Sequence, residues 1–279
     1  MQSDSIERMR RAAVGRLEDL QRAGVMQLPK RAAVLQSGDA APREPAGPAA
    51  EAASPDSRPA TIAAANPKGA GWPPAGAGAL FHDEEGGLSP EVSSAPTLTV
   101  LQQQVAGCTR CDELARTRTQ TVFGVWNPSA RLCFLGEAPG ADEDRLGEPF
   151  VGRAGQLLTK IIEACRMKRE DVYILNMIKC RPPGNRNPLP HELANCRGYL
   201  ERQLDLIRPE LICCLGAVAA QNLLGTTQSI GKLRGKVHAY RGGKVVCTYH
   251  PAFLLRSPSF KKETWEDMKL LMRELGVEL

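Results

Sequence analysis

Short apolar runs and amphipathic stretches alternate along the C-terminal two-thirds of this chain. Four runs have the length of a buried strand, at residues 131–136, 172–176, 210–216 and 244–249. Between and after them, apolar residues recur every three to four positions over 156–165, 190–207, 217–224 and 261–275. Strand-like runs that alternate with helical periodicity are typical of a mostly parallel sheet with helices on both faces. The pattern therefore predicts an α/β domain.

The first 96 residues carry a different pattern. Residues 6–20 place apolar side chains three to four positions apart among arginines, which predicts a short amphipathic helix. Such a helix would either dock on a protein partner or be marginal and fray in solution. Residues 36–96 hold ten of the 21 prolines and show no apolar period, so we expect a disordered linker. The predicted parts are an extension over 1–35, this linker over 36–96, and a folded domain over 97–279 that begins at a candidate N-cap, Thr97.

The net charge of +5 is unevenly distributed along the chain. Residues 98–279 carry 26 Lys and Arg against 19 Asp and Glu, whereas residues 36–97 are acidic. A basic folded part indicates a polyanionic partner or simply a basic protein, and charge alone does not separate the two. No run reaches the length of a membrane span, and the N-terminal pattern is not that of a secretory signal. We therefore expect a cytoplasmic protein. We also expect it to be bacterial and a monomer.

In a reducing cytoplasm the nine cysteines are metal ligands, core residues or reactive thiols rather than disulfides. Cys108 and Cys111 form a closely spaced pair, and Cys180 and Cys196 follow at a distance. Together they can hold zinc or an iron–sulfur cluster, which is the favoured interpretation. The alternative is that they are core residues, and Cys196 is compatible with it because it lies on an apolar helical stripe. The other cysteines fall in apolar runs and are expected to be small buried hydrophobes: Cys133, Cys165, Cys213, Cys214 and Cys247.

Each strand-like run ends in a residue suited to a binding site. Glu137 follows the first run, Asn176 closes the second, Gly216 closes the third and His250 follows the fourth. In parallel sheets these ends meet at one edge, and ligands bind there. We therefore expect Glu137, Asn176 and His250 to lie close together around a pocket.

Five motifs occur in order around these positions. They read Gly-Glu-Ala-Pro-Gly at 136–140, Glu-Asp at 143–144, Pro-Phe-Val-Gly-Arg-Ala-Gly at 149–155, Lys-Cys-Arg-Pro-Pro-Gly-Asn-Arg at 179–186, and His-Pro-Ala-Phe-Leu-Leu-Arg at 250–256. With the four spaced cysteines, they closely resemble the family 4 uracil-DNA glycosylases, over about residue 97 to the C-terminus. The resemblance implies a three-layer α/β/α domain around a four-stranded parallel sheet. It implies hydrolysis of the N-glycosidic bond of uracil in single- or double-stranded DNA, which leaves an abasic site for base excision repair. It also implies a [4Fe–4S] cluster held by Cys108, Cys111, Cys180 and Cys196.

The resemblance assigns roles around a base flipped out of the DNA. Phe150 is expected to stack on the uracil in place of the neighbouring bases. Asn176 is expected to donate to O4 and accept from N3–H, a pattern that cytosine reverses. His250 is suited to hydrogen-bond O2 as negative charge grows on the leaving base.

The carboxylates are expected to have separate roles, one at the sugar and one near the base. Other uracil glycosylase families have an aspartate where this chain has Ala138, so that residue's role cannot be transferred. Glu137 is the first candidate to stabilise the oxocarbenium-like sugar and position the water. Glu143 is expected to guard the pocket near uracil C5 against the thymine methyl, and Asn185 to assist near the sugar or the water.

Basic and apolar residues near the same edge are expected to bind the DNA. Arg153, Lys179, Arg234 and Arg256 are candidates for phosphate contacts. Leu254 or Leu255 could wedge into the vacated base step, and the sequence does not separate the two.

Two other functions are compatible with parts of the pattern. A relative that captures the abasic sugar covalently uses a His in the loop after the second strand, but His191 is expected to open the following helix. A non-catalytic nucleic-acid-binding protein with a structural metal site would not need Glu137, Asn176 and His250 at one edge. Removal of uracil is therefore the leading hypothesis.

Overall fold

The apolar runs form the strands of one sheet. The computed structural model describes Val92 and residues 94–279, and these residues belong to one compact unit. The expected helix over 6–20 and nearly all of the expected linker lie outside the described residues. The strands are β1 (Val125–Trp126), β2 (Leu132–Gly136), β3 (Tyr173–Asn176), β4 (Leu211–Leu215), β5 (Val237–Tyr240) and β6 (Gly243–Thr248).

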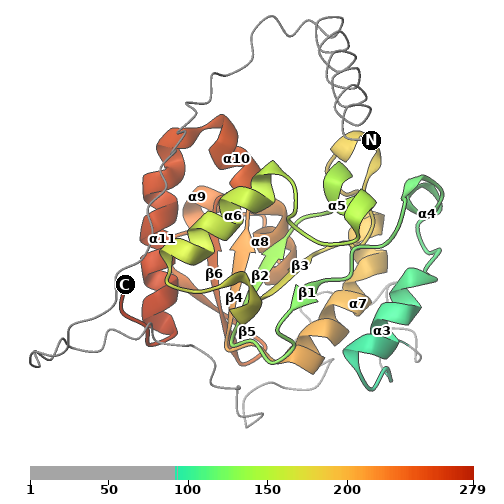
Figure 1. The fold of residues 1–279 in the computed structure, drawn as a ribbon, viewed down its shortest axis with the longest axis horizontal. Coiled ribbons are helices and arrows are strands. Elements are labelled where there is room, and N and C mark those ends of the chain that lie inside the picture. Colours follow the sequence, from blue (N-terminus) through green and yellow to red (C-terminus); the bar gives the residue numbers. More distant parts are fainter. Residues whose placement is uncertain (1–91, 93) are drawn as a thin grey trace, which may run out of the picture. The chain divides into compact units, whose positions relative to one another are not determined.

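The sheet has a parallel centre and antiparallel edges. Its order is β1-β3-β2-β4-β6-β5. Strands β3, β2, β4 and β6 are parallel, while β1 pairs antiparallel with β3 and β5 with β6. The expected parallel four-stranded sheet is confirmed as the centre, and the two edge strands extend it (Figure 1).

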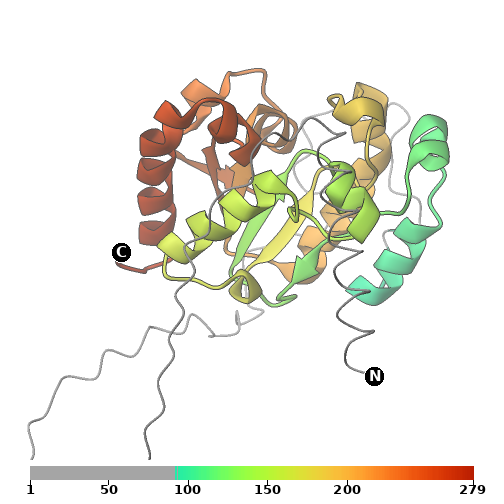
Figure 2. The same ribbon diagram turned by 45° about the horizontal axis from the view of Figure 1, so that its top comes forward.

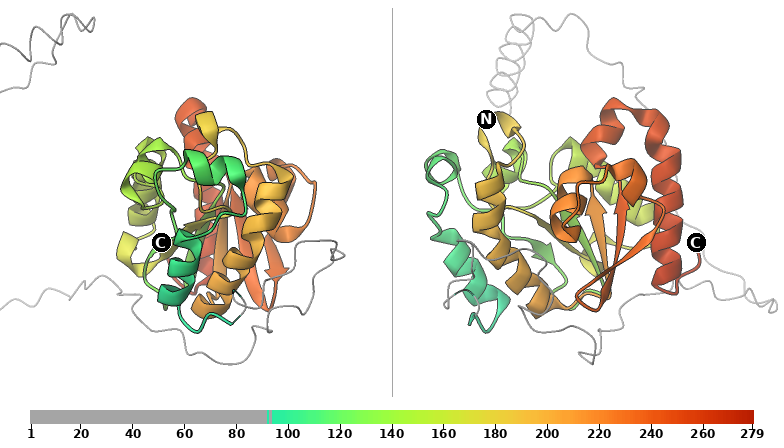
Figure 3. Two further views of the ribbon diagram at one scale, coloured as in Figure 1. Left: turned by 90° about the vertical axis from the view of Figure 1, so that its right-hand side faces the viewer. Right: turned by 180° about the vertical axis from the view of Figure 1, so that it is seen from behind.

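Helices cover both faces of the sheet (Figure 3). Successive strand residues alternate between the faces: Phe134 packs with α6 (Arg153–Ala164) and α11 (Lys261–Glu274), whereas Leu135 packs with α7 (Pro190–Ile207) and α8 (Ala217–Leu224). The three-layer α/β/α arrangement is therefore confirmed. The remaining described helices are α3 (Leu98–Ala106), α4 (Asp112–Thr117), α5 (Ala141–Leu146), α9 (Ile230–Leu233) and α10 (Pro251–Arg256), with 3-10 turns η1 (Arg169–Asp171), η2 (Pro183–Asn185) and η3 (Pro258–Phe260).

The folded domain begins before the expected boundary at residue 97. Thr97 caps α3 as predicted, since its side chain accepts a hydrogen bond from the Val100 N–H at 3.3 Å. Val92 and Ala95, however, are already buried, and Arg202 of α7 donates to the Ala95 carbonyl. Helix α3 packs against α7, with α4 following it (Figure 2).

In the described part of the chain, no helix is both long and apolar enough to cross a membrane.

Candidate active site and four-cysteine site

Asn176 and Phe150 lie side by side against the end of β2. Gly136 is the register partner of Asn176 on the neighbouring strand. A Cβ on Gly136 would lie 2.3 Å from Oδ1 of Asn176 and 2.5 Å from Cζ of Phe150. Because those distances exclude any side chain, Gly136 is what allows the amide and the ring to approach the sheet edge together.

The Asn176 side chain is buried with an unused acceptor. It is 1% exposed, and its Oδ1 has no hydrogen-bond partner among the described residues. A buried polar atom left unpaired costs about 1–3 kcal/mol. The atom is therefore placed to accept a hydrogen bond from a donor that enters the site.

His250 presents a neutral ring to the same site. Its Nδ1 accepts a hydrogen bond from the Ala252 N–H at 3.1 Å, which leaves Nε2 as the protonated, donating nitrogen. Burial lowers the pKa of His250 to about 4, and the positive charge of Arg256 acts in the same direction. The ring centroids of His250 and Phe150 are 5.6 Å apart. Gly216, which follows β4, lies against His250, since a Cβ there would be 3.0 Å from the histidine Cβ. The expected convergence of strand ends is thus confirmed for Asn176 and His250.

Glu137 lies directly after β2 and is half-buried. Within the described part of the chain, its carboxylate makes no hydrogen bond or ion pair with a neighbouring side chain. Burial raises its pKa above the ordinary value of a glutamate. A carboxylate in this state retains its full capacity to bind water or stabilise a cation.

Glu143 has surroundings different from those expected. Its Oε1 accepts from the backbone N–H groups of Val151 and Gly152, each at 3.0 Å, and its Oε2 accepts from the Gly140 N–H at 3.1 Å. The carboxylate therefore ties the loop after β2 to the loop that carries Phe150. These contacts give it a role in positioning the two loops, and its expected place near uracil C5 stays a prediction.

Asn185 lies apart from this group in its contacts. It is exposed in the turn η2, and its Oδ1 accepts from Nε of Arg181 at 2.7 Å. His191 is exposed in the first turn of α7, so the structure brings neither residue into contact with Asn176 or His250.

Of the four spaced cysteines, Cys108 lies near enough to the other three to affect the pKa of each. Burial raises the pKa of Cys180 and that of Cys196, the latter to about 12, and the nearby Cys108 thiol acts in the same direction on both. Burial also raises the pKa of Cys111, and the nearby Cys108 thiol acts in the same direction. The remaining cysteines are fully buried, as predicted for small core residues: Cys133, Cys165, Cys213, Cys214 and Cys247.

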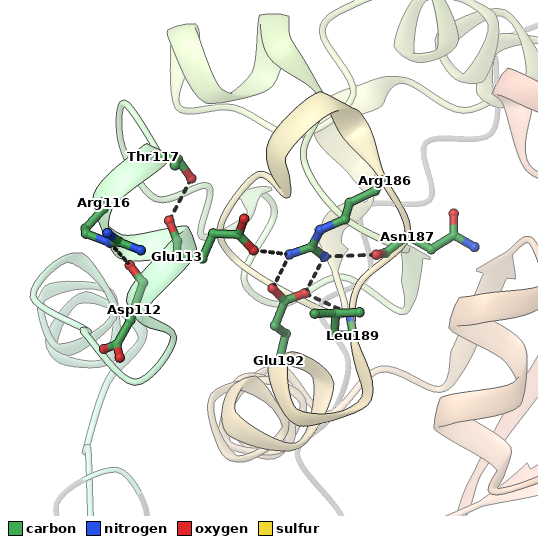
Figure 4. Close-up of polar contacts among 8 residues, drawn as sticks. All are labelled: Asp112, Glu113, Arg116, Thr117, Arg186, Asn187, Leu189 and Glu192. Atoms are coloured by element: carbon green, nitrogen blue, oxygen red, sulfur yellow. Dashed lines mark hydrogen bonds and ion pairs between the residues drawn. The ribbon is translucent and has the colours of Figure 1, made fainter.

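Arg186 joins the segments that carry these cysteines (Figure 4). Its guanidinium donates to both oxygens of Glu192, at 2.9 and 2.7 Å, and to Glu113 at 2.7 Å. Glu113 belongs to α4, which begins after Cys111, and Glu192 lies in the first turn of α7, ahead of Cys196. Arg186 itself follows Cys180 in the loop, so one side chain connects three separate segments.

Comparison with known proteins agrees with this arrangement. A sequence model of the Uracil DNA glycosylase superfamily matches residues 123–269. This chain belongs to the uracil DNA glycosylase superfamily. The type-4 uracil-DNA glycosylase of Archaeoglobus fulgidus is 45% identical over 181 residues, which cover 62% of this chain and 90% of that protein. The type-4 enzyme of Thermotoga maritima is 45% identical over 164 residues, 58% of this chain and 85% of that protein. A type-5 uracil-DNA glycosylase of Pyrobaculum aerophilum is 33% identical over 142 residues, 44% of this chain and 62% of that protein. The resemblance to family 4 is confirmed.

Two of the basic residues expected to bind DNA in this glycosylase are engaged by other groups of the protein. Lys179 is 1% exposed and donates from Nζ to the Asn176 carbonyl at 2.8 Å, and burial lowers its pKa to about 8. Arg234 donates from Nε to the buried Asp267 at 3.0 Å and also to the Glu263 carbonyl. The prediction of phosphate contacts is wrong for Lys179, and Arg234 is committed to the packing of α11.

The other residues predicted to contact DNA differ in how exposed they are. Arg153 and Arg256 are exposed, at the start of α6 and the end of α10. Leu254 is fully buried, whereas Leu255 is 38% exposed. Leu255 is therefore the leucine available to a ligand, and Leu254 is corrected to a core residue.

Sequence reasoning missed residues that position the glycosylase site. Asp267, fully buried in α11, accepts from Thr248 Oγ1 at 2.7 Å and fixes the end of β6 just before His250. Arg169 holds the loop of Phe150 through backbone carbonyls. Asp267 and Arg169 lie outside the recognised motifs, and only long-range contacts reveal them.

Proposed function

We propose that this protein is a DNA-repair enzyme of the type-4 class that flips uracil out of DNA and hydrolyses its N-glycosidic bond. The observation that carries the proposal is the unpaired, buried Oδ1 of Asn176 beside Phe150 and His250. Uracil N3–H is a donor that suits this acceptor, and the base is flat enough to lie against the Phe150 ring. Cytosine offers an acceptor at N3, which would leave the buried oxygen unpaired.

Two groups at the site suit the charges that develop as the bond breaks. The leaving uracil becomes an anion, and the Nε2–H of the neutral His250 can donate to O2 as this charge grows. The sugar becomes cation-like, and the carboxylate of Glu137, free of protein partners in the described structure, can stabilise it and orient the attacking water. Neither group needs to be consumed, because water supplies the hydroxyl and the released base takes up a proton.

The four-cysteine site suits a [4Fe–4S] cluster. Cys108 lies near enough to Cys111, Cys180 and Cys196 to act electrostatically on all three. Each thiolate of a four-iron cluster binds a different iron, so its ligands stand farther apart than those of a single zinc. Cys108, Cys111, Cys180 and Cys196 would hold the cluster, which when bound would cross-link α4, the loop after β3 and α7. Hydrolysis of uracil requires no electron transfer, so the proposed role of the cluster is structural.

Excision of uracil from a labelled single-stranded oligonucleotide tests the function. We expect the wild-type protein to create abasic sites only where uracil stands, and Glu137→Gln to lower the single-turnover rate by about 10²-fold or more. Asp142→Asn is the matched control, because Asp142 is an exposed carboxylate of α5 that pairs with Arg145. The proposal is refuted if the wild-type protein leaves uracil in place, and the role of Glu137 is refuted if both variants behave alike.

A further inference from the structure

Phe150 has a backbone conformation that its residue type disfavours. Its φ is +55°, in the left-handed region that aromatic residues rarely adopt, and its side chain is buried. Such a conformation persists only where the surroundings impose it. The groups that impose it also determine where the ring lies above Gly136 and beside His250.

Arg169 holds this backbone from one side. From the turn η1, its Nη2 donates to the carbonyl of Pro149 at 2.7 Å and to that of Phe150 at 2.8 Å. Its Nη1 donates to Oγ1 of Thr159 in α6 at 2.9 Å. One planar guanidinium therefore fixes two consecutive peptide groups against a helix, which the single ammonium of a lysine cannot reproduce.

Gly155 closes the other side of the Phe150 peptide. A Cβ on Gly155 would lie 1.8 Å from the Phe150 carbonyl oxygen, so the backbone of α6 directly abuts this carbonyl. The Thr159 hydroxyl donates in turn to the Gly155 carbonyl at 3.1 Å. Arg169, Thr159 and Gly155 thus form one connected support around a single carbonyl group.

We infer that Arg169 is a positioning residue for the flipped base, because it holds Phe150 in the conformation that makes its ring the wall of the uracil site. The inference rests on the proposed function for the identity of the base. Arg169 touches backbone carbonyls and Thr159, so it acts on the ligand through Phe150. Loss of the Arg169 side chain should weaken binding of the flipped base without lowering the affinity for DNA that lacks uracil.

Single-turnover excision measured over a range of enzyme concentrations separates these effects. For Arg169→Gln we expect the half-saturating concentration on uracil-containing DNA to rise roughly tenfold, within the range that one base–aromatic stack contributes. Binding to the same oligonucleotide with thymine in place of uracil should be unchanged. Arg169→Lys should recover only part of the loss, because lysine restores the charge but not the two-carbonyl fork.

A double-mutant cycle tests whether Arg169 acts through Phe150. In a Phe150→Ala background, Arg169→Gln should cause no further loss, since the ring that it positions is gone. Fully additive losses would overturn the inference. The control is Arg131→Gln, which removes a similar half-buried arginine, one that binds Glu210 and the Leu275 carbonyl before the start of β2. Equal losses in Arg131→Gln would show that the effect is general destabilisation.

Hydrogen exchange of the free protein provides a readout independent of excision. The amides of Val151 and Gly152 are protected by Glu143, and loosening of the Phe150 loop in Arg169→Gln should speed their exchange. If Arg169→Gln speeds this exchange but the wild-type protein excises no uracil, the role of Arg169 in holding the loop stands and the proposed function is refuted. Unchanged exchange and unchanged excision would refute the inference itself.

Discussion

Replacing Glu192 by Gln should destabilise the part of the protein that joins the cysteine-bearing segments. The Glu192 side chain is 1% exposed, and it accepts two hydrogen bonds from Arg186 and one from the Leu189 N–H at 2.7 Å. The Arg186 hydrogen bond is the main cause that lowers the pKa of Glu192, so its charge is stabilised in the folded protein. Figure 4 shows the pair at the centre of the network.

The expected loss is roughly 2–3 kcal/mol in the free energy of unfolding. Breaking a buried ion pair costs about 3–5 kcal/mol when one charge is left alone. Here Arg186 is 30% exposed and retains Glu113, and the glutamine oxygen can still accept from Leu189, so the cost falls below that range. Because the pKa of Glu192 is lowered on folding, its contribution is present above the ordinary glutamate pKa and is lost as the pH falls through the lowered one.

Thermal unfolding, and the iron content that the proposed cluster would give the purified protein, provide the assay. We expect Glu192→Gln to melt earlier at neutral pH and to retain less iron per chain, with the difference in melting shrinking at acid pH. The control is Glu201→Gln on the same helix, where an i,i+4 pair with Arg197 contributes about 0.3–0.5 kcal/mol. If Glu192→Gln matched Glu201→Gln in melting and iron content, the reasoning would be refuted.

Three further predictions concern the active site. Asn176→Ala should lower uracil excision about 10–100-fold while leaving binding to uracil-free DNA unchanged, and equal losses in both assays would contradict its role as the base reader. The excision rate should fall as the pH drops through a value above the ordinary 4.5 of a glutamate, because burial raises the pKa of Glu137 and only the ionised form stabilises the sugar cation. His250, with a pKa of about 4, stays neutral there, so Glu137→Gln should flatten this acid limb and an unchanged limb would exclude Glu137 as its source. Leu255→Ala should weaken excision from duplex DNA at unchanged melting temperature, whereas Leu254→Ala should cost about 2–5 kcal/mol of stability, and the reverse result would undo their assignment.

The centre of the fold could be predicted from the sequence because its strands are buried on both faces. Such strands read as continuous apolar runs, and helices between them show a clear apolar period. Helices α7 and α8 have the predicted bounds, and each central strand differs from its prediction by at most one residue at either end. The edge strands β1 and β5 were not predicted, since β1 is two residues long and β5 leaves alternate side chains exposed.

The position of the site was predictable for the same reason, but the surroundings of its charged residues were not. Parallel strands in register bring their ends together, so Asn176 and His250 converge once the strands are known. Lys179 follows Asn176 closely in the sequence, so the sequence suggests a basic residue that contacts DNA at the edge where the strands end. Its burial follows from the chain turning back so that the ammonium reaches the Asn176 carbonyl, a contact that no local pattern reports. The loop contacts of Glu143 were hidden for the same reason.

The active site combines features that oppose folding with contacts that hold them in place. The unpaired oxygen of Asn176, the desolvated Glu137 and His250, and the left-handed Phe150 each raise the free energy of the free protein. In the proposed function, a flipped uracil would relieve the first by hydrogen bonding and would use the others without requiring them to move. Groups already fixed in position need no reorganisation when charge develops, which is the condition under which electrostatic stabilisation of a transition state is largest. On this proposal, the buried contacts behind the site contribute to catalysis although they never touch the base, and the hydrogen bond from Arg169 to the Phe150 carbonyl is one of them.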